Sequence, residues 1–134
     1  MVPPQTQTRT QAFIFDMDGT VIDSMPYHAP AMSHLKMRDT PQTIVGGDEG
    51  LPGKPEPAIF LEASRRMAVS ASACIVFEDA PFGIEAARRA GMRAVAICSS
   101  HSAAELGGPH VLAPVRNYDE LLNSNFLEKL HVAA

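Results

Sequence analysis

Two carboxylates stand two residues apart at Asp16 and Asp18, after the apolar run of residues 12–15 and before Gly19. An apolar run closed by a glycine turn is typical of a buried strand, so both side chains are expected at the mouth of a sheet. A carboxylate there can act as a nucleophile or metal ligand, and a second beside it can carry protons. The alternative is that the pair merely caps a turn.

A second acidic pair, Glu78 and Asp79, follows the apolar run of residues 73–77. Neighbouring parallel strands would bring both acidic pairs to one edge, where ligands bind in such sheets. Carboxylates so close repel one another unless a cation joins them, and oxygen ligands without histidine or cysteine favour Mg²⁺. The alternative is that this pair caps a helix starting near Pro81.

Lys54 lies in Gly53-Lys54-Pro55, after a glycine-rich stretch. On its own such a lysine would be a solvated surface residue, but its context allows it to bring positive charge to the acidic edge. A nucleophilic carboxylate, a carboxylate proton carrier, Mg²⁺ and a lysine together indicate phosphoryl transfer.

Apolar patterns along the chain alternate between strands and helices. Strands are predicted at residues 11–16, 43–45, 73–77, 93–97 and, more weakly, 111–112. Helices are predicted at residues 27–36, 57–68, 81–90 and 118–130. This alternation predicts a three-layer, Rossmann-like α/β fold with a mostly parallel sheet and helices on both faces.

Length and composition predict one domain over residues 11–134, after a polar, frayed leader at 1–10. The chain is 46% hydrophobic and 19% charged, as expected for a soluble globular protein. A net charge of −4 argues against nucleic-acid binding, and no apolar run reaches the ~20 residues of a membrane span. Cys74 and Cys98 lie in apolar runs, which predicts buried free thiols and a cytoplasmic location.

Three segments resemble motifs of the haloacid dehalogenase-like (HAD) hydrolases, in the correct order. Residues 15–24 resemble the first motif, residues 53–57 the third, and residues 76–87 the fourth. The fourth motif has the form found in the β-phosphoglucomutase-like and sugar-phosphatase branch. The resemblance covers roughly residues 11–122 and implies an HAD-like core.

The resemblance also implies a role for each acidic residue. Asp16 would attack phosphorus and become an aspartyl phosphate, while Asp18 would serve as general acid and base. Mg²⁺ would be held by the side chains of Asp16 and Asp79 and the backbone carbonyl of Asp18, with Glu78 binding directly or through water. Lys54 would neutralise the nucleophile and the phosphoryl oxygens.

The sequence departs from the family between its first and third motifs. Residues 19–52 are too few for the helical cap of this branch, and they contain no apolar strand ending in the Ser or Thr of the second motif. The simplest interpretation is that both are missing, with the join near Met32 and Ser33. Losing one phosphate donor typically costs about 10²–10³-fold in rate. A missing strand would leave an exposed edge, which predicts a homodimer covering the open site.

Three functions fit these observations. The first is a weak, unselective, capless Mg²⁺-dependent phosphatase acting through an aspartyl phosphate on small phosphorylated metabolites such as sugar phosphates. The second is a catalytically impaired remnant that binds ligands or forms oligomers. The third, ranked last, is a phosphomutase, because retaining a bisphosphate intermediate requires an enclosing cap.

Overall fold

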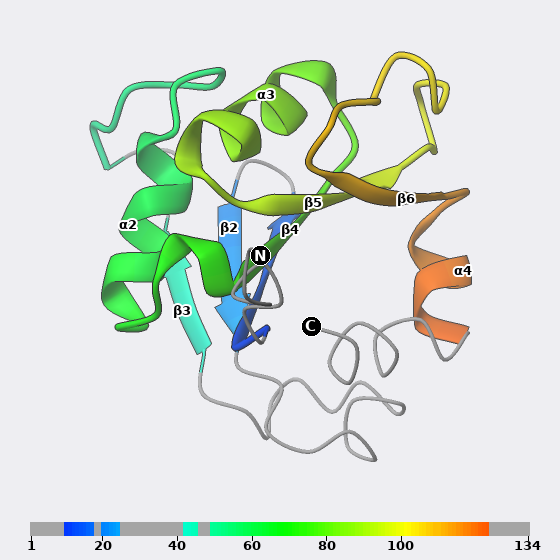
Figure 1. The fold of residues 1–134 in the computed structure, drawn as a ribbon. Helices are drawn as coiled ribbons and strands as arrows, with labels where there is room; N and C mark the ends of the chain where they lie inside the picture. The colour runs from blue at the N-terminus through cyan, green and yellow to red at the C-terminus, as the bar shows by residue number, and fades with distance from the viewer. Residues whose placement is uncertain (1–9, 18–19, 25–41, 46–48, 124–134) are drawn as a thin grey trace, which may run out of the picture.

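The computed structural model describes residues 10–17, 20–24, 42–45 and 49–123. Its strands are β1 (Ala12–Met17), β2 (Thr20–Ser24), β3 (Gln42–Val45), β4 (Cys74–Glu78), β5 (Arg93–Ile97) and β6 (Val111–Val115). The helices are α2 (Ala58–Arg66), α3 (Pro81–Ala90) and α4 (Tyr118–Asn123), with a short 3₁₀ turn at Ala71–Ala73 (Figure 1).

The described strands form one six-stranded sheet in the order β3-β2-β1-β4-β5-β6. β1, β4, β5 and β6 run parallel, whereas β2 pairs antiparallel with β1 and with β3. The predicted α/β fold with a mostly parallel sheet is therefore confirmed.

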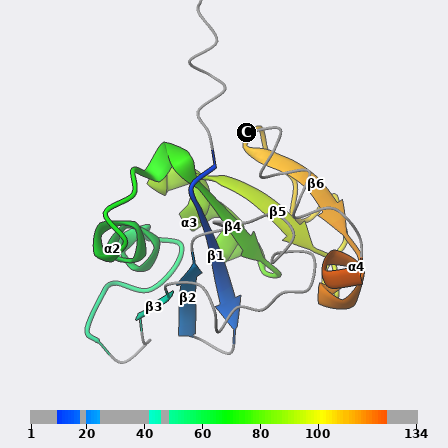
Figure 2. The same ribbon diagram turned by 90° about the horizontal axis from the view of Figure 1, so that it is seen from below.

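Strand β2 was not predicted, and it changes the expected edges of the sheet. It pairs with β1 through a register that places Met17 opposite Thr20. Because β2 lies on the side of β1 opposite β4, as Figure 2 shows, β1 is paired along both sides. An exposed edge was expected from the missing strand, and it does not lie at β1. The described sheet ends instead at β3 and at β6, and β6 carries Pro114, a residue typical of edge strands.

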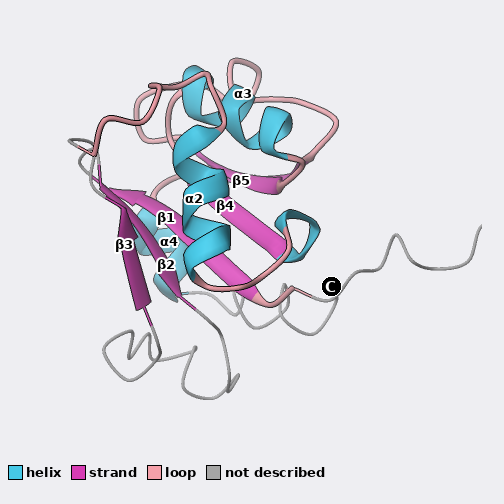
Figure 3. Cartoon of the chain, turned by 90° about the vertical axis from the view of Figure 1, so that its left-hand side faces the viewer, coloured by secondary structure: helices cyan, strands magenta, loops and turns pink. Residues whose placement is uncertain are grey.

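Alternate residues of the central strands build two separate cores. On one face, Ile14, Val76 and Ala96 pack with α2 and α3. On the other face, Phe15, Phe77 and Ile97 pack with Leu121 of α4. Figure 3 shows α2 and α3 on one side of the sheet and α4 on the other, so the predicted helix cover on both faces is confirmed.

The helix boundaries follow from local chemistry. Pro81 occupies the first turn of α3, where its missing N–H costs nothing, and Gly91 ends the helix with a left-handed φ of 78°. The buried face of α2 consists of Ile59, Phe60, Ala63 and Ser64. The predicted helix 27–36 and the later part of 118–130 lie outside the described residues.

Both cysteines are free thiols, as predicted, with Cys74 buried and Cys98 partly buried. The cytoplasmic location inferred from them stays a prediction. Among the described residues, no helix has the length and apolar character needed to cross a membrane.

Candidate active site

Strands β1 and β4 bring the two acidic motifs together at the carboxyl edge of the sheet. Phe15 on β1 is paired with Phe77 on β4. Asp16 and Glu78 are the residues that directly follow this pair on the two strands. Ligand oxygens of Asp16, Glu78 and Asp79 all lie within 4.8 Å of one another. The predicted convergence of these three residues is present, while Asp18 lies outside the described residues.

Lys54 reaches this cluster from the loop that precedes α2. Its ammonium forms an ion pair with Asp16 and lies 3.0 Å from Oε2 of Glu78. It also lies 5.5 Å from the centroid of the Phe60 ring, which supplies a cation–π contact from α2. The alternative of a solvated surface lysine is therefore wrong for Lys54.

The carboxylates keep Lys54 charged in spite of its partial burial. Desolvation by burial alone would lower the pKa of the ammonium, but the carboxylates of Glu78 and Asp16 outweigh it and raise that pKa. Lys54 thus supplies a permanent positive charge at the edge of the acidic cluster. A positive charge at this point can stabilise negative charge that develops on a bound substrate.

Glu78 is completely buried, and this burial governs its protonation. Desolvation and, after it, the neighbouring Asp16 carboxylate raise the pKa of its carboxyl to about 8, against the opposing effect of the Lys54 ammonium. Oε1 of Glu78 accepts the backbone N–H groups of Asp79 at 3.1 Å and Ala80 at 3.3 Å.

These bonds bear on the alternative that the acidic pair only caps a helix. The N-cap position of α3 is Ala80, and the helix starts without a side-chain cap bond. Glu78 satisfies amides of the strand-to-helix turn with one oxygen, and its other oxygen contacts Lys54. Glu78 therefore stabilises the turn before α3 with one oxygen and does not cap the helix.

Gly83 allows the first turn of α3 to approach Glu78 closely. A Cβ added at Gly83 would lie 1.8 Å from the carboxyl carbon of Glu78. Any larger residue would displace the carboxyl group or the helix, because real Cβ atoms do not come so near another atom. Gly83 lies within the segment that resembles the fourth motif, and this packing role was not predicted.

The acidic cluster fits a hard divalent cation. Oδ1 of Asp16 is buried and finds no hydrogen-bond partner among the described residues. Buried carboxylate oxygens are rarely left unpaired, because desolvation without a partner is costly. Three carboxyl groups face a single lysine here, and oxygen donors of this kind suit Mg²⁺ or a similar ion. Asp16, Glu78 and Asp79 are therefore the described residues that could hold it.

Tyr118, from the start of α4, was not singled out from the sequence. Its hydroxyl is 3.4 Å from the carbonyl oxygen of Asp16 and 3.5 Å from that of Phe77, so it donates weakly across the ends of β1 and β4. Burial raises the pKa of this phenol, and the carboxylates of Glu78, Asp79 and Asp16 add to the effect. Tyr118 therefore remains a neutral donor. A buried tyrosine needs a hydrogen-bond partner for its hydroxyl, and this requirement was the signal that could have pointed to Tyr118.

The two described histidines lie outside the acidic cluster. His101 is paired with Glu105 at 3.6 Å, and Nε2 of His110 lies 2.9 Å from the carbonyl oxygen of Ile84. Within the described part of the chain, the one group of metal-ligating side chains is the acidic cluster, and it contains neither histidine nor cysteine.

Residues 29–97, just over half of the chain, match the family model of the haloacid dehalogenase-like hydrolases. The chain belongs to this family. The match includes Lys54, Glu78 and Asp79, and it begins after Asp16. The placement of Asp16 in an HAD site therefore depends on its contacts with Lys54 and Glu78.

Similar proteins of the HAD family include two curated phosphatases. The chain is 47% identical over 64 residues to fructose-1-phosphate phosphatase YqaB of Escherichia coli, covering 48% of this chain and 34% of that protein. It is 36% identical over 94 residues to validoxylamine A 7'-phosphate phosphatase of Streptomyces hygroscopicus, covering 69% and 44%. The chain thus matches less than half the length of either relative.

Solved HAD structures share the fold. A family IA HAD hydrolase from Entamoeba histolytica is 32% identical with a TM-score of 0.54, over 64% of this chain and 39% of that one. This similarity agrees with the parallel sheet and the covering helices described above.

Proposed function

We propose that this chain is a phosphohydrolase that cleaves small phosphate monoesters through an aspartyl phosphate on Asp16. The observation that carries the proposal is the contact of Lys54 with both Asp16 and Glu78, at one end of two neighbouring strands, in a member of the HAD family. Relatives of the chain are named as phosphatases, one of them acting on fructose 1-phosphate. We therefore infer sugar phosphates and similar small metabolites as the substrate class.

In the proposed mechanism, a carboxylate oxygen of Asp16 attacks phosphorus as the bond from phosphorus to the ester oxygen breaks. Asp18 gives its proton to the departing oxygen, a role taken from the family resemblance. Asp18 then removes a proton from water, and the water oxygen attacks phosphorus. The second step releases inorganic phosphate and regenerates Asp16 as a carboxylate and Asp18 as an acid.

Lys54 is proposed to position the nucleophile and to neutralise the phosphoryl oxygens. Its ammonium faces Asp16 from within hydrogen-bond range and stays charged, because the surrounding carboxylates raise its pKa. A fixed cation of this kind stabilises charge that develops in the transition state without having to reorganise.

Asp16, Glu78 and Asp79 are proposed to hold Mg²⁺, together with the backbone carbonyl of Asp18. When bound, this ion would neutralise charge on the phosphoryl oxygens. The support is the buried Oδ1 of Asp16, which has no hydrogen-bond partner in the described part of the chain, and the three carboxylates within 4.8 Å. The homodimer expected from the sequence stays a prediction, which sedimentation at high concentration would test.

The test is release of phosphate from p-nitrophenyl phosphate with Mg²⁺, compared with the same reaction in EDTA. We expect release by the native chain, none in EDTA, and none by Asp16→Asn, which removes the nucleophile. Asp119→Asn alters an exposed carboxylate outside the cluster and should keep the native rate. Equal rates for Asp16→Asn and the native chain would reject the aspartyl-phosphate mechanism and leave the non-catalytic remnant as the better description.

A further inference from the structure

The two helices on the Lys54 side of the sheet contain the same charged pattern. It is Glu-Ala-Ser-Arg-Arg at residues 62–66 of α2 and Glu-Ala-Ala-Arg-Arg at residues 85–89 of α3. In each copy both arginines bind the glutamate of their own helix. The four Nε-to-carboxylate distances are 2.8 Å for Arg65, 2.7 Å for Arg66, 2.8 Å for Arg88 and 2.8 Å for Arg89.

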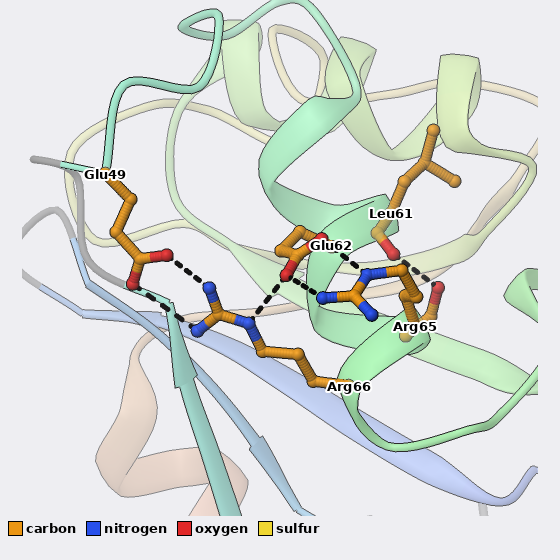
Figure 4. A network of polar contacts seen from close by, with 6 residues as sticks. Glu49, Leu61, Glu62, Arg65 and Arg66 are labelled. Atoms are coloured by element: carbon orange, nitrogen blue, oxygen red, sulfur yellow. Dashed lines mark hydrogen bonds and ion pairs between the residues drawn. The ribbon is translucent and has the colours of Figure 1, made fainter.

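The second arginine of each copy also reaches a glutamate in the loop that carries Lys54. Arg66 binds the Glu49 carboxylate with both terminal nitrogens, with Nη1 lying 3.4 Å from Oε2 (Figure 4). Nη1 of Arg89 lies 3.2 Å from Oε2 of Glu56. The first arginines differ, because Arg65 and Arg88 reach no loop glutamate among the described residues.

The two loop glutamates stand on either side of Lys54. Residues 49–57 contribute no fully buried side chain, and Leu51 packs against the core only partly buried, so the hydrophobic core holds this segment weakly. Within the loop, the Glu56 N–H donates to the carbonyl oxygen of Gly53 at 3.0 Å. This bond connects Glu56, the partner of Arg89, to the residue that precedes Lys54. A segment with little buried area depends on its polar contacts for its position.

We propose that Arg66 and Arg89 are positioning residues that hold the loop so that Lys54 lies between Asp16 and Glu78. Each arginine is anchored by the glutamate of its own helix, which orients the guanidinium toward the loop. The two fixed points belong to different helices, so each limits movement of a different end of residues 49–56. The consequence for catalysis depends on the proposed phosphatase function, whereas the consequence for the placement of Lys54 does not.

The test measures the exposure of Lys54 directly. The full chain without Mg²⁺ is treated briefly with acetic anhydride, and mass spectrometry gives the acetylation rate at Lys54. The variants are Arg66→Gln and Arg89→Gln, with Arg65→Gln and Arg88→Gln as matched controls that lose a helix pair but no loop contact. Exposed ion pairs shift an equilibrium by up to about five-fold, so we expect a two- to five-fold faster reaction for each loop-contacting variant.

The control variants should acetylate Lys54 at the native rate, and Arg89→Lys should restore part of the protection by keeping one charged contact. In the double variant Arg66→Gln/Arg89→Gln the two effects should roughly multiply. Equal rates in all four single variants, or equal increases in all four, would overturn the positioning role. If the native chain releases no phosphate, the proposed function fails while the acetylation pattern still decides this inference.

In a chain that does release phosphate, the two loop-contacting variants should lower kcat/KM by a similar two- to five-fold. The controls should not do so, although all four lose one surface charge. If the four variants unfold at the same midpoint, the decrease in kcat/KM comes from the placement of Lys54 and not from a loss of stability. A decrease of the same size in Arg65→Gln or Arg88→Gln would contradict the inference.

Discussion

The ammonium of Lys54 lies 3.0 Å from the buried carboxyl group of Glu78 while it also pairs with the carboxylate of Asp16. One cation thus serves two acids that belong to neighbouring strands, and Asp79 adds a third acid beside them. This relationship explains why burial does not discharge Lys54, and why the cluster retains negative charge that a divalent ion would neutralise.

Replacing Lys54 by methionine should impair both catalysis and stability. We expect phosphate release to fall by about 10²–10³-fold, the usual loss when one preorganised charge is removed from a reacting centre. Because Lys54 is partly exposed, the free energy of unfolding should fall by about 1–3 kcal/mol, less than for a fully buried pair. Steady-state kinetics and urea unfolding measure the two effects. A native rate for Lys54→Met would remove it from the mechanism.

The stability of the metal-free protein should depend on pH through Glu78. Its folded pKa of about 8 lies above the ordinary value of 4.5, so the folded state binds more protons between these pH values. Stability is therefore full below pH 4.5 and falls as the pH rises toward and through 8. The slope is at most about 1.4 kcal/mol per pH unit for one proton.

Urea unfolding in EDTA between pH 5 and 8.5 measures this dependence. Glu78→Gln mimics the protonated carboxyl and should flatten the slope. Binding of Mg²⁺ near pH 7 should release part of a proton, because metal ligands must be deprotonated. Calorimetry in buffers of different ionisation enthalpy detects that release. A native slope in Glu78→Gln would assign the pH dependence to another group.

Gly83→Ala should disrupt the acidic cluster, since the added Cβ would meet the Glu78 carboxyl carbon at 1.8 Å. Overpacking of this kind typically costs about 1–3 kcal/mol, and here it would also displace a proposed metal ligand. The control is Gly107→Ala, whose added Cβ would meet its nearest atoms at ordinary contact distances of 3.5 and 3.6 Å. Thermal unfolding with and without Mg²⁺ compares the two, and equal Mg²⁺ affinities would contradict the packing argument.

Much of the fold followed from local signals in the sequence. The uninterrupted apolar run before Glu78 indicated a strand buried on both faces, and β4 is completely buried. Pro81 and Gly91 marked the two ends of α3 because their backbone preferences suit those positions. The meeting of Asp16 with Glu78 and Asp79 was expected if their strands were parallel neighbours, as β1 and β4 are.

Other features depend on contacts that no local pattern records. β2 is short and mixes polar with apolar residues, and it is defined by its pairing with β1 and β3. Arg66 and Arg89 are partly exposed residues on α2 and α3. Their contacts with Glu49 and Glu56 join distant segments and could not be read from helical spacing.

Reduction with borohydride during turnover tests the central claim most directly, because it converts an aspartyl phosphate to homoserine. The chain is treated while it hydrolyses p-nitrophenyl phosphate with Mg²⁺, and mass spectrometry of its peptides locates any homoserine. We predict homoserine at position 16 only, its absence in EDTA, and its absence in Asp16→Asn. Phosphate release without homoserine at position 16, or homoserine at another aspartate, would contradict the assignment of Asp16 as the nucleophile.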